Sequence, residues 1–169
     1  MKRILIVALL ALLLTGCGAE PTFETVADQP DLLVSAQPRQ ILLELPKDAK
    51  EQIGEQGDKL YLCDGFTVSL QTVEAGDLDK TLRSTTGYGR EELTLMQMQG
   101  TDGKHYRCVW AAAGEGQTQV GKTYIVDDGN YHYVLTVMVP EETAGQLASQ
   151  LQDIADSFQI VDGDFSTGS

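Results

Sequence analysis

Three pairs of β-rich segments, each joined by a short turn containing Asp-Gly, constrain the fold of this chain most. In the first pair, Asp64-Gly65 separates segments 59–63 and 66–73. This dipeptide between two β-rich segments indicates a hairpin, because a type I′ turn needs positive φ at both central residues. The other pairs are 93–99 with 104–113 and 117–126 with 131–139. Successive hairpins predict an antiparallel sheet.

The hairpin register predicts which side chains share a face of the sheet. The Asp64-Gly65 turn pairs Cys63 with Phe66, so one face carries Tyr61, Cys63, Phe66, Val68 and Leu70. In segment 104–113, the set expected to face the core is Tyr106, Cys108 and Trp110, and the alternate set is His105, Arg107 and Val109. Segment 131–139 is nearly all apolar, as expected of a central strand covered on both faces.

Two helices are expected. Asp77 is a candidate N-cap for a short helix ending near Thr85, and Gly87 is suited to end it. A long C-terminal helix is expected to begin at Pro140. Its apolar stripe is formed by Leu147, Leu151, Ile154 and Phe158. Residues 159–161 are expected to return as a short strand.

Before the first hairpin, residues 40–45 form a strand candidate, and residues 47–57 are polar and predict a loop or weak helical turn. The fold class is therefore α+β: an antiparallel β-sheet of about six or seven strands, packed by a short helix and a long C-terminal helix. This order of elements over residues 40–161 resembles the PsbP-like fold. The resemblance implies a binding or assembly factor rather than an enzyme, and it transfers no functional residue.

The N-terminus has the pattern of an export signal. Lys2 and Arg3 precede an apolar run of 11 residues, from Ile4 to Leu14. A membrane-spanning helix needs about 20 apolar residues, so this run suits a signal-peptide core instead. The run ends in Leu14-Thr15-Gly16-Cys17, which resembles the bacterial lipobox. The resemblance implies cleavage before Cys17 and attachment of lipid to that cysteine.

The chain is expected to divide into four parts. Residues 1–16 form the signal peptide, residues 17–38 the lipidated N-terminus and a flexible tether, residues 39–161 one α+β domain, and residues 162–169 a disordered tail. The net charge of the whole chain is −13, and loss of Lys2 and Arg3 with the signal peptide lowers it by two, to about −15. This charge argues against nucleic acid as a partner and against electrostatic attraction to anionic lipid.

The two cysteines after Cys17 leave two interpretations open. Cys63 and Cys108 form an even pair in an exported domain, where disulfides persist. They equally suit two buried thiols that pack as small apolar side chains.

His105 and His132 are the only histidines, and alternation places both on an outer face. They would need a carboxylate at the right spacing to bind a metal. We expect two solvated surface histidines, and therefore no metal, no cofactor and no catalytic residue. Sequence motifs for hydrolases and phosphate binding do not occur either.

These features predict an exported lipoprotein, held at the cell membrane or outer envelope by lipid on Cys17, with its domain facing the extracytoplasmic side. Its function is expected to be non-enzymatic binding of a protein or small ligand, or assembly of a larger complex. The alternative is a metal-dependent or hydrolytic envelope enzyme that uses His105 and His132 together. That alternative requires the two imidazoles to lie close to each other.

Overall fold

The computed structural model of the 169-residue chain describes residues 37–54, 58–113 and 116–162. The signal peptide, Cys17, nearly all of the expected tether and residues 163–169 of the expected tail lie outside these ranges. No helix of the described residues is long and apolar enough to cross a membrane.

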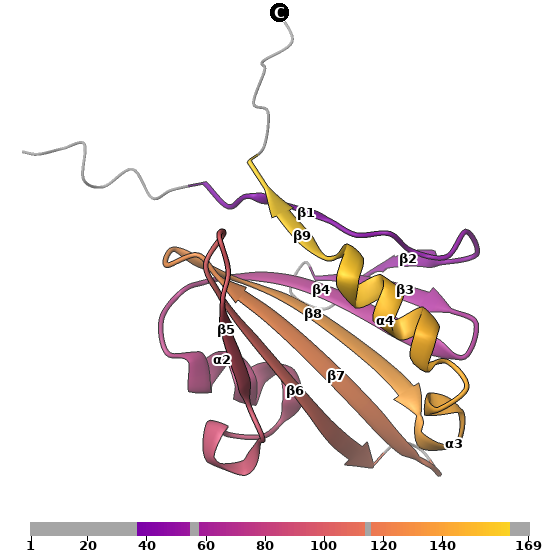
Figure 1. Cartoon of the computed structure of the whole chain (residues 1–169). Coiled ribbons are helices and arrows are strands. Elements are labelled where there is room, and N and C mark those ends of the chain that lie inside the picture. Colours follow the sequence, from indigo (N-terminus) through magenta and orange to yellow (C-terminus); the bar gives the residue numbers. More distant parts are fainter. Residues whose placement is uncertain (1–36, 55–57, 114–115, 163–169) are drawn as a thin grey trace, which may run out of the picture. The chain divides into compact units, whose positions relative to one another are not determined.

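Seven strands form one antiparallel sheet, in the order β2-β3-β4-β8-β7-β6-β5 (Figure 1). In chain order the strands are β2 (Lys50–Ile53), β3 (Lys59–Cys63), β4 (Phe66–Glu74), β5 (Met96–Gln99), β6 (Lys104–Ala113), β7 (Thr118–Asp127) and β8 (Tyr131–Pro140). The expected fold class is confirmed. β8 lies at the centre of the sheet, which explains why its sequence is apolar on both faces.

All three hairpins form where the Asp-Gly turns predict them. Cys63 pairs with Phe66 and Tyr61 pairs with Val68, as expected, and Gly65 has φ of +81°. A positive φ is readily adopted only by glycine, so this turn is encoded locally. The non-sequential neighbours β4 and β8 pair over eight residues, and this long-range contact joins the two halves of the sheet.

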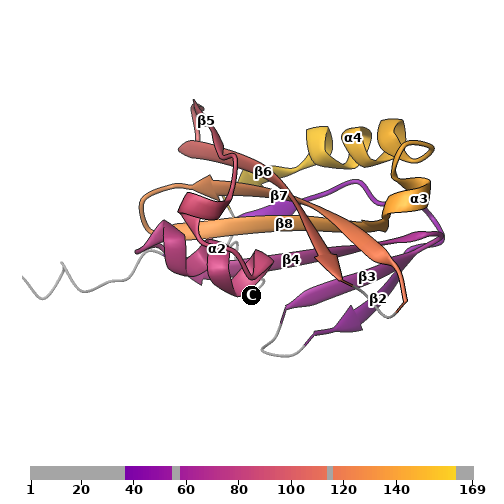
Figure 2. The same cartoon turned by 90° about the horizontal axis from the view of Figure 1, so that it is seen from below.

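The helices lie on opposite faces of this sheet. α2 (Leu78–Thr86) covers one face, and α4 (Ala148–Ser157) covers the other (Figure 2). The α4 face packs Leu151 and Ile154 against apolar side chains of β4 and β8. The α2 face packs Leu82 against Tyr106, Cys108 and Trp110 of β6 and their neighbours. Burial of these two apolar sets is the main stabilising contribution to the fold.

α2 has the caps that its sequence predicts. The Asp77 side chain accepts a hydrogen bond from the Asp79 N–H at 3.0 Å. Gly87 follows the helix at φ of +82°, and its N–H donates to the Arg83 carbonyl. Both ends are therefore determined within a few residues of sequence.

The C-terminal helix is broken, which corrects the expectation of one long helix. α3 (Glu141–Ala144) ends at Gly145, and α4 begins only after Leu147. Phe158 is extended and caps α4, yet Leu147 and Phe158 still pack against the same cluster as Leu151. The predicted apolar stripe was right, although the continuous helix was wrong.

Three predictions near the edges of the domain were also wrong in extent. The first strand, β1, is Gln40–Leu42 rather than 40–45, and it pairs with β9 (Gln159–Val161) in a separate two-stranded sheet. β2 forms within the segment expected to be a loop or helical turn. β5 begins at Met96 rather than at residue 93, and a short 3-10 turn, η3 (Arg90–Glu92), lies before it. β1 pairs with the distant β9, whereas β2 and β5 each pair with the next strand in the chain. Local polarity does not encode any of these pairings.

Candidate functional site

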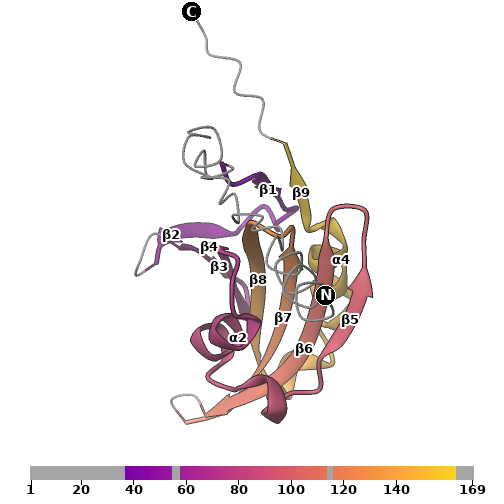
Figure 3. The ribbon, with the colours of Figure 1, turned by 90° about the vertical axis from the view of Figure 1, so that its left-hand side faces the viewer.

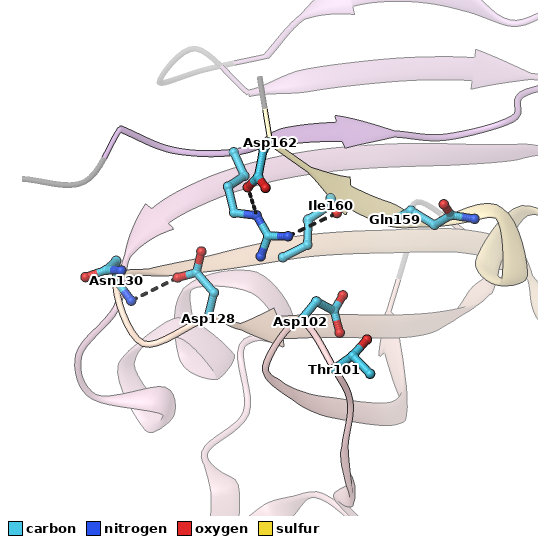
Figure 4. Close-up of a pocket in the computed structure, with 8 residues that line it drawn as sticks. Thr101, Asp102, Asp128, Asn130, Gln159, Ile160 and Asp162 are labelled. Carbon is cyan, nitrogen blue, oxygen red and sulfur yellow. Dashed lines mark hydrogen bonds and ion pairs between the residues drawn. The ribbon is translucent and has the colours of Figure 1, made fainter. Parts of the chain in front are cut away.

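A polar cleft of about 750 Å³ lies where the β5–β6 and β7–β8 turns approach the β1–β9 pair (Figure 4). The residues that line it are Arg39, Thr101, Asp102, Asp128, Asn130, Gln159, Ile160 and Asp162. Arg39 Nε lies 3.0 Å from an Asp162 carboxylate oxygen, and Arg39 Nη2 donates to the Ile160 carbonyl at 3.4 Å. The guanidinium is therefore engaged with the C-terminal strand and the residue that follows it.

The Asp128 carboxylate in this cleft is also fully engaged. It accepts hydrogen bonds from the N–H groups of Asn130 and Tyr131, at 2.9 and 2.8 Å, and from the Tyr133 hydroxyl at 3.0 Å. Burial alone would raise the pKa of Asp128. The hydrogen bonds from Tyr131, Asn130 and Tyr133, together with the nearby Arg39 charge, outweigh burial, so this pKa lies below its ordinary value. The Tyr133 hydroxyl in turn accepts from the Arg39 N–H at 2.8 Å. This network ties Arg39, just before β1, to the β7–β8 turn and the start of β8, so we assign it a structural role.

A second cleft, of about 530 Å³, lies between the chain around β1 and strands β3 and β4. Several of its lining side chains belong to the core cluster on the α4 face, among them Leu43, Leu45 and Leu70. This cleft is the seam where the β1 segment packs on the main sheet.

A third, mostly apolar cleft of about 340 Å³ lies on the α4 face, where α4 leaves the edge of the sheet uncovered. It is lined by Thr94, Met96, Arg107, Cys108, Val109, Lys122, Tyr124 and Gln152. We call it the apolar cleft. The β5–β6 hairpin curls toward the side of the sheet that carries α4, as Figures 2 and 3 show, and forms one wall. Met96 and Val109 are each 61% exposed there, and neighbouring Met98 is 47% exposed.

Two cations flank this apolar surface. Arg107 pairs with Met96 across β5 and β6, and Lys122 pairs with Val109 across β6 and β7. The Arg107 guanidinium carbon lies 5.5 Å from the centre of the Tyr124 ring, within the range of a cation–π contact. Within residues 37–54, 58–113 and 116–162, no carboxylate lies within ion-pairing distance of Arg107 or Lys122.

The Tyr124 hydroxyl is held in its neutral form at this cleft. Burial raises its pKa, and the Asp156 carboxylate raises it further, while the Arg107 guanidinium acts in the opposite direction. Tyrosine is neutral at pH 7 even at its ordinary pKa, so the Tyr124 hydroxyl can donate a hydrogen bond there. An apolar floor, two cations and a neutral phenol suit an apolar ligand that carries a negative charge.

The two histidines lie on opposite faces of the sheet, which corrects the expectation that they share an outer face. His105 is half-buried on the α4 face, and its Nε2 lies 2.6 Å from Asp102. His132 is only 1% exposed, beneath α2, and its Nδ1 lies 2.8 Å from the Thr81 hydroxyl. His105 pairs with Val126 of β7, and His132 pairs with the next residue, Asp127. Because successive residues of a strand point to opposite faces, the sheet lies between the two imidazoles.

A shared two-histidine site is therefore wrong for this fold, and with it the enzyme that required one. In the part of the chain that the structure describes, no group of three or more His, Cys, Asp or Glu side chains is placed to hold a metal ion.

Cys63 and Cys108 are free thiols in this structure. Cys63 packs with the α4-face cluster, whereas Cys108 is buried in the α2-face cluster. Strands β4, β8 and β7 lie between their two strands, a separation of about 19 Å at the usual strand spacing. A disulfide needs Cα atoms within about 7 Å. The geometry favours two separate thiols over the bridge, and burial raises the pKa of each thiol.

Known proteins resemble this chain at its N-terminus and in the fold of its domain. Residues 1–17 match the family model described as a prokaryotic membrane lipoprotein lipid attachment site. No curated protein matches the chain.

Two solved structures share the fold. One is a protein from Bacteroides thetaiotaomicron VPI-5482, at 14% identity and a TM-score of 0.51, matched over 72% of this chain and 45% of that one. This chain thus spans less than half the length of the Bacteroides chain. The other is cyanobacterial PsbP (CyanoP) from Synechocystis sp. PCC 6803, at 10% identity and a TM-score of 0.50, matched over 88% of this chain and 99% of that one.

These findings define the class. The lipid attachment site indicates a bacterial lipoprotein, and the antiparallel α+β domain has the fold of PsbP, which confirms the resemblance suggested by element order. At such low identity the likeness establishes the fold alone.

Sequence reasoning missed the apolar cleft. Alternation correctly placed Arg107 and Val109 opposite the aromatic set of β6, but it gave no reason to single them out. The available signal was the segment Met96-Gln-Met-Gln99, which puts two apolar side chains on one face of a strand with no charged residue.

Proposed function

We propose that the mature chain is a non-enzymatic binding lipoprotein, anchored by lipid on Cys17, whose domain faces the extracytoplasmic side and docks a partner in the apolar cleft. In this proposal residues 1–16 are removed, residues 17–38 span the distance from the lipid, and residues 39–161 form the binding domain. The partner is a protein with an apolar, acidic docking segment.

The exposed cationic and apolar cleft is the observation that carries this proposal. Exposed apolar side chains gathered on one surface of a monomer commonly mark a binding site. Met96, Met98 and Val109 gather on one face. The charged side chains of the polar cleft, in contrast, already have hydrogen-bond or ion-pair partners within the chain. In a chain of net charge −13, Arg107 and Lys122 provide local positive charge, and no carboxylate among the described residues forms an ion pair with either. They select for a carboxylate on the incoming segment.

Site-specific photo-crosslinking in intact cells tests the proposal. A photo-reactive amino acid at position 109 lies on the floor of the apolar cleft. The matched control places the same group at Ile53, which is 89% exposed on β2 at the opposite edge of the sheet. We expect a discrete adduct from position 109 that position 53 does not form, identified by mass spectrometry.

When Lys122→Gln is added to the chain that carries the photo-reactive amino acid at position 109, the yield of the adduct should fall. Lys104→Gln in the same chain should leave the yield unchanged. Lys104 lies on the neighbouring strand at a position that faces α2, so it matches the change in charge without touching the cleft. The same adducts from positions 109 and 53, or none from 109, would contradict a binding role for this cleft.

A further inference from the structure

Among the residues that the structure describes, no strand pairs with the outer edge of β5, and this edge borders the apolar cleft. β5 is the last strand of the seven-stranded order, and its sequence Met-Gln-Met-Gln contains no charge and no proline. Sheet edges are normally protected by charged residues, proline or bulges, because their unpaired backbone groups attract other strands. The other edge strand, β2, carries Lys50 and Glu51.

The hydrogen-bond phase of the β5–β6 pair determines which backbone groups face outward. The Gly100 N–H donates to the Gly103 carbonyl at 2.8 Å. Antiparallel pairs alternate between hydrogen-bonded and non-hydrogen-bonded positions, so Met96 and Met98 bond to β6 while Gln97 and Gln99 do not. The N–H and C=O groups of Gln97 and Gln99 therefore point to the free edge.

The side chains beside this edge would meet those of an added strand. Met96 and Met98 lie on the α4 face, in register with Arg107 and His105 of β6. Alternate side chains of a strand paired with β5 would lie next to these methionines and lead into the apolar cleft. Arg107 lies on β6, about 10 Å from an added strand at the usual strand spacing, a distance that an extended arginine and an extended acidic side chain can bridge together. Lys122 lies one strand farther into the apolar cleft.

We propose that the partner supplies an extended peptide segment that pairs with the β5 edge as an added strand, directing apolar side chains into the apolar cleft and a carboxylate toward Arg107 and Lys122. This inference rests on the proposed function, because it describes how the cleft holds its partner. Strand addition of this kind takes affinity from main-chain hydrogen bonds and specificity from the alternate side chains. A second copy of this chain is a poorer occupant, since it carries the same negative net charge and presents an uncharged edge.

Selection from a phage-displayed library of random linear peptides on the full mature lipoprotein in detergent tests the inference. We expect enriched peptides with alternating apolar residues, at least one Asp or Glu, and no central proline. A selected peptide, made synthetically, should bind Gln97→Pro about tenfold more weakly, because proline removes an outward N–H and blocks the edge without breaking a bond to β6. Ile53→Pro, the equivalent change on the β2 edge, should bind like the wild type.

Amide hydrogen exchange of the wild-type lipoprotein supplies a second measurement, which does not depend on whether the Gln97→Pro variant folds. On binding of the selected peptide, exchange at Gln97 and Gln99 should slow at least tenfold. Unchanged exchange at these two amides, equal binding by Gln97→Pro, or a library that yields no peptide would overturn strand addition. If the crosslink from position 109 persists in Gln97→Pro cells, the cleft binds its partner in another way. If that crosslink is absent from the wild type as well, the proposed function itself fails.

Discussion

Buried polar side chains under α2 pair with one another. The Trp110 indole N–H donates to the Thr123 hydroxyl at 3.0 Å, and the Thr123 and Thr136 hydroxyls lie 3.1 Å apart. His132 and Thr81 form the other buried pair. Each pair satisfies groups that would cost stability if left unpaired away from water. Local sequence cannot reveal such pairs, because their members come from different strands and a helix.

The buried His132 imidazole should make the domain sensitive to mild acid. Burial lowers the pKa of His132 below its ordinary value of 6.5, although Asp127 and Asp128 act in the opposite direction. The folded state therefore binds fewer protons than the unfolded state just below pH 6.5. By linkage, this contribution to the free energy of unfolding is fully present above pH 6.5 and is lost as the pH falls toward the folded-state pKa.

His132→Asn tests this linkage, because asparagine can still pair with Thr81 but does not titrate. Urea unfolding from pH 7.5 to 5 should show a decline in the wild type's free energy of unfolding that is smaller in the variant. Parallel curves for the two proteins would show that His132 does not drive the decline.

Two glycines in the C-terminal half differ in whether their surroundings leave room for a side chain, and only the packing around them shows this difference. A Cβ atom at Gly121 of β7 would overlap the Trp110 indole ring across the sheet. A Cβ atom at Gly145, between α3 and α4, meets nothing within 4 Å, and its backbone is right-handed helical. In the sequence both are single glycines, between Val120 and Lys122 and between Ala144 and Gln146, and neither setting reveals the difference.

Gly121→Ala should therefore destabilise the domain by about 1–3 kcal/mol, the usual cost of forcing extra volume into a packed core. The matched control Gly145→Ala should be neutral or stabilise by about 0.4–1 kcal/mol, because alanine restricts the unfolded chain. Urea unfolding monitored by Trp110 fluorescence measures both. Equal effects of the two substitutions would contradict the packing of Trp110 on Gly121.

The elements themselves were predicted best where their signals are local. The Asp64-Gly65 turn, the Asp77 cap and the Gly87 end of α2 all act within a few residues, and all were confirmed. β2 and the break at Gly145 were missed. A polar segment became a strand by pairing with β3, and the helix ended at Gly145, a single glycine of low helix propensity within an otherwise helical segment.

The location of the whole chain in the cell depends on Cys17. If lipid on this cysteine is the anchor, Cys17→Ser should move the protein from the membrane fraction to the soluble fraction. The wild-type chain should also have an intact mass above that of the unmodified mature polypeptide. Cys63→Ser, which alters a half-buried thiol of the domain, should leave the protein on the membrane. An unmodified Cys17 thiol in the wild type would remove the basis for the anchor.

The amino-acid sequence determined the features that depend on neighbouring residues: the lipid attachment pattern, the three hairpin turns, the caps of α2 and the alternation along each strand. Alternation shows which side chains of one strand share a face, but not which face of the assembled sheet they join. The pairing of β4 with β8 and the placement of α2 and α4 made that choice. For this reason only the tertiary structure separated His105 from His132, placed Cys63 and Cys108 apart, and left the apolar cleft open beside β5.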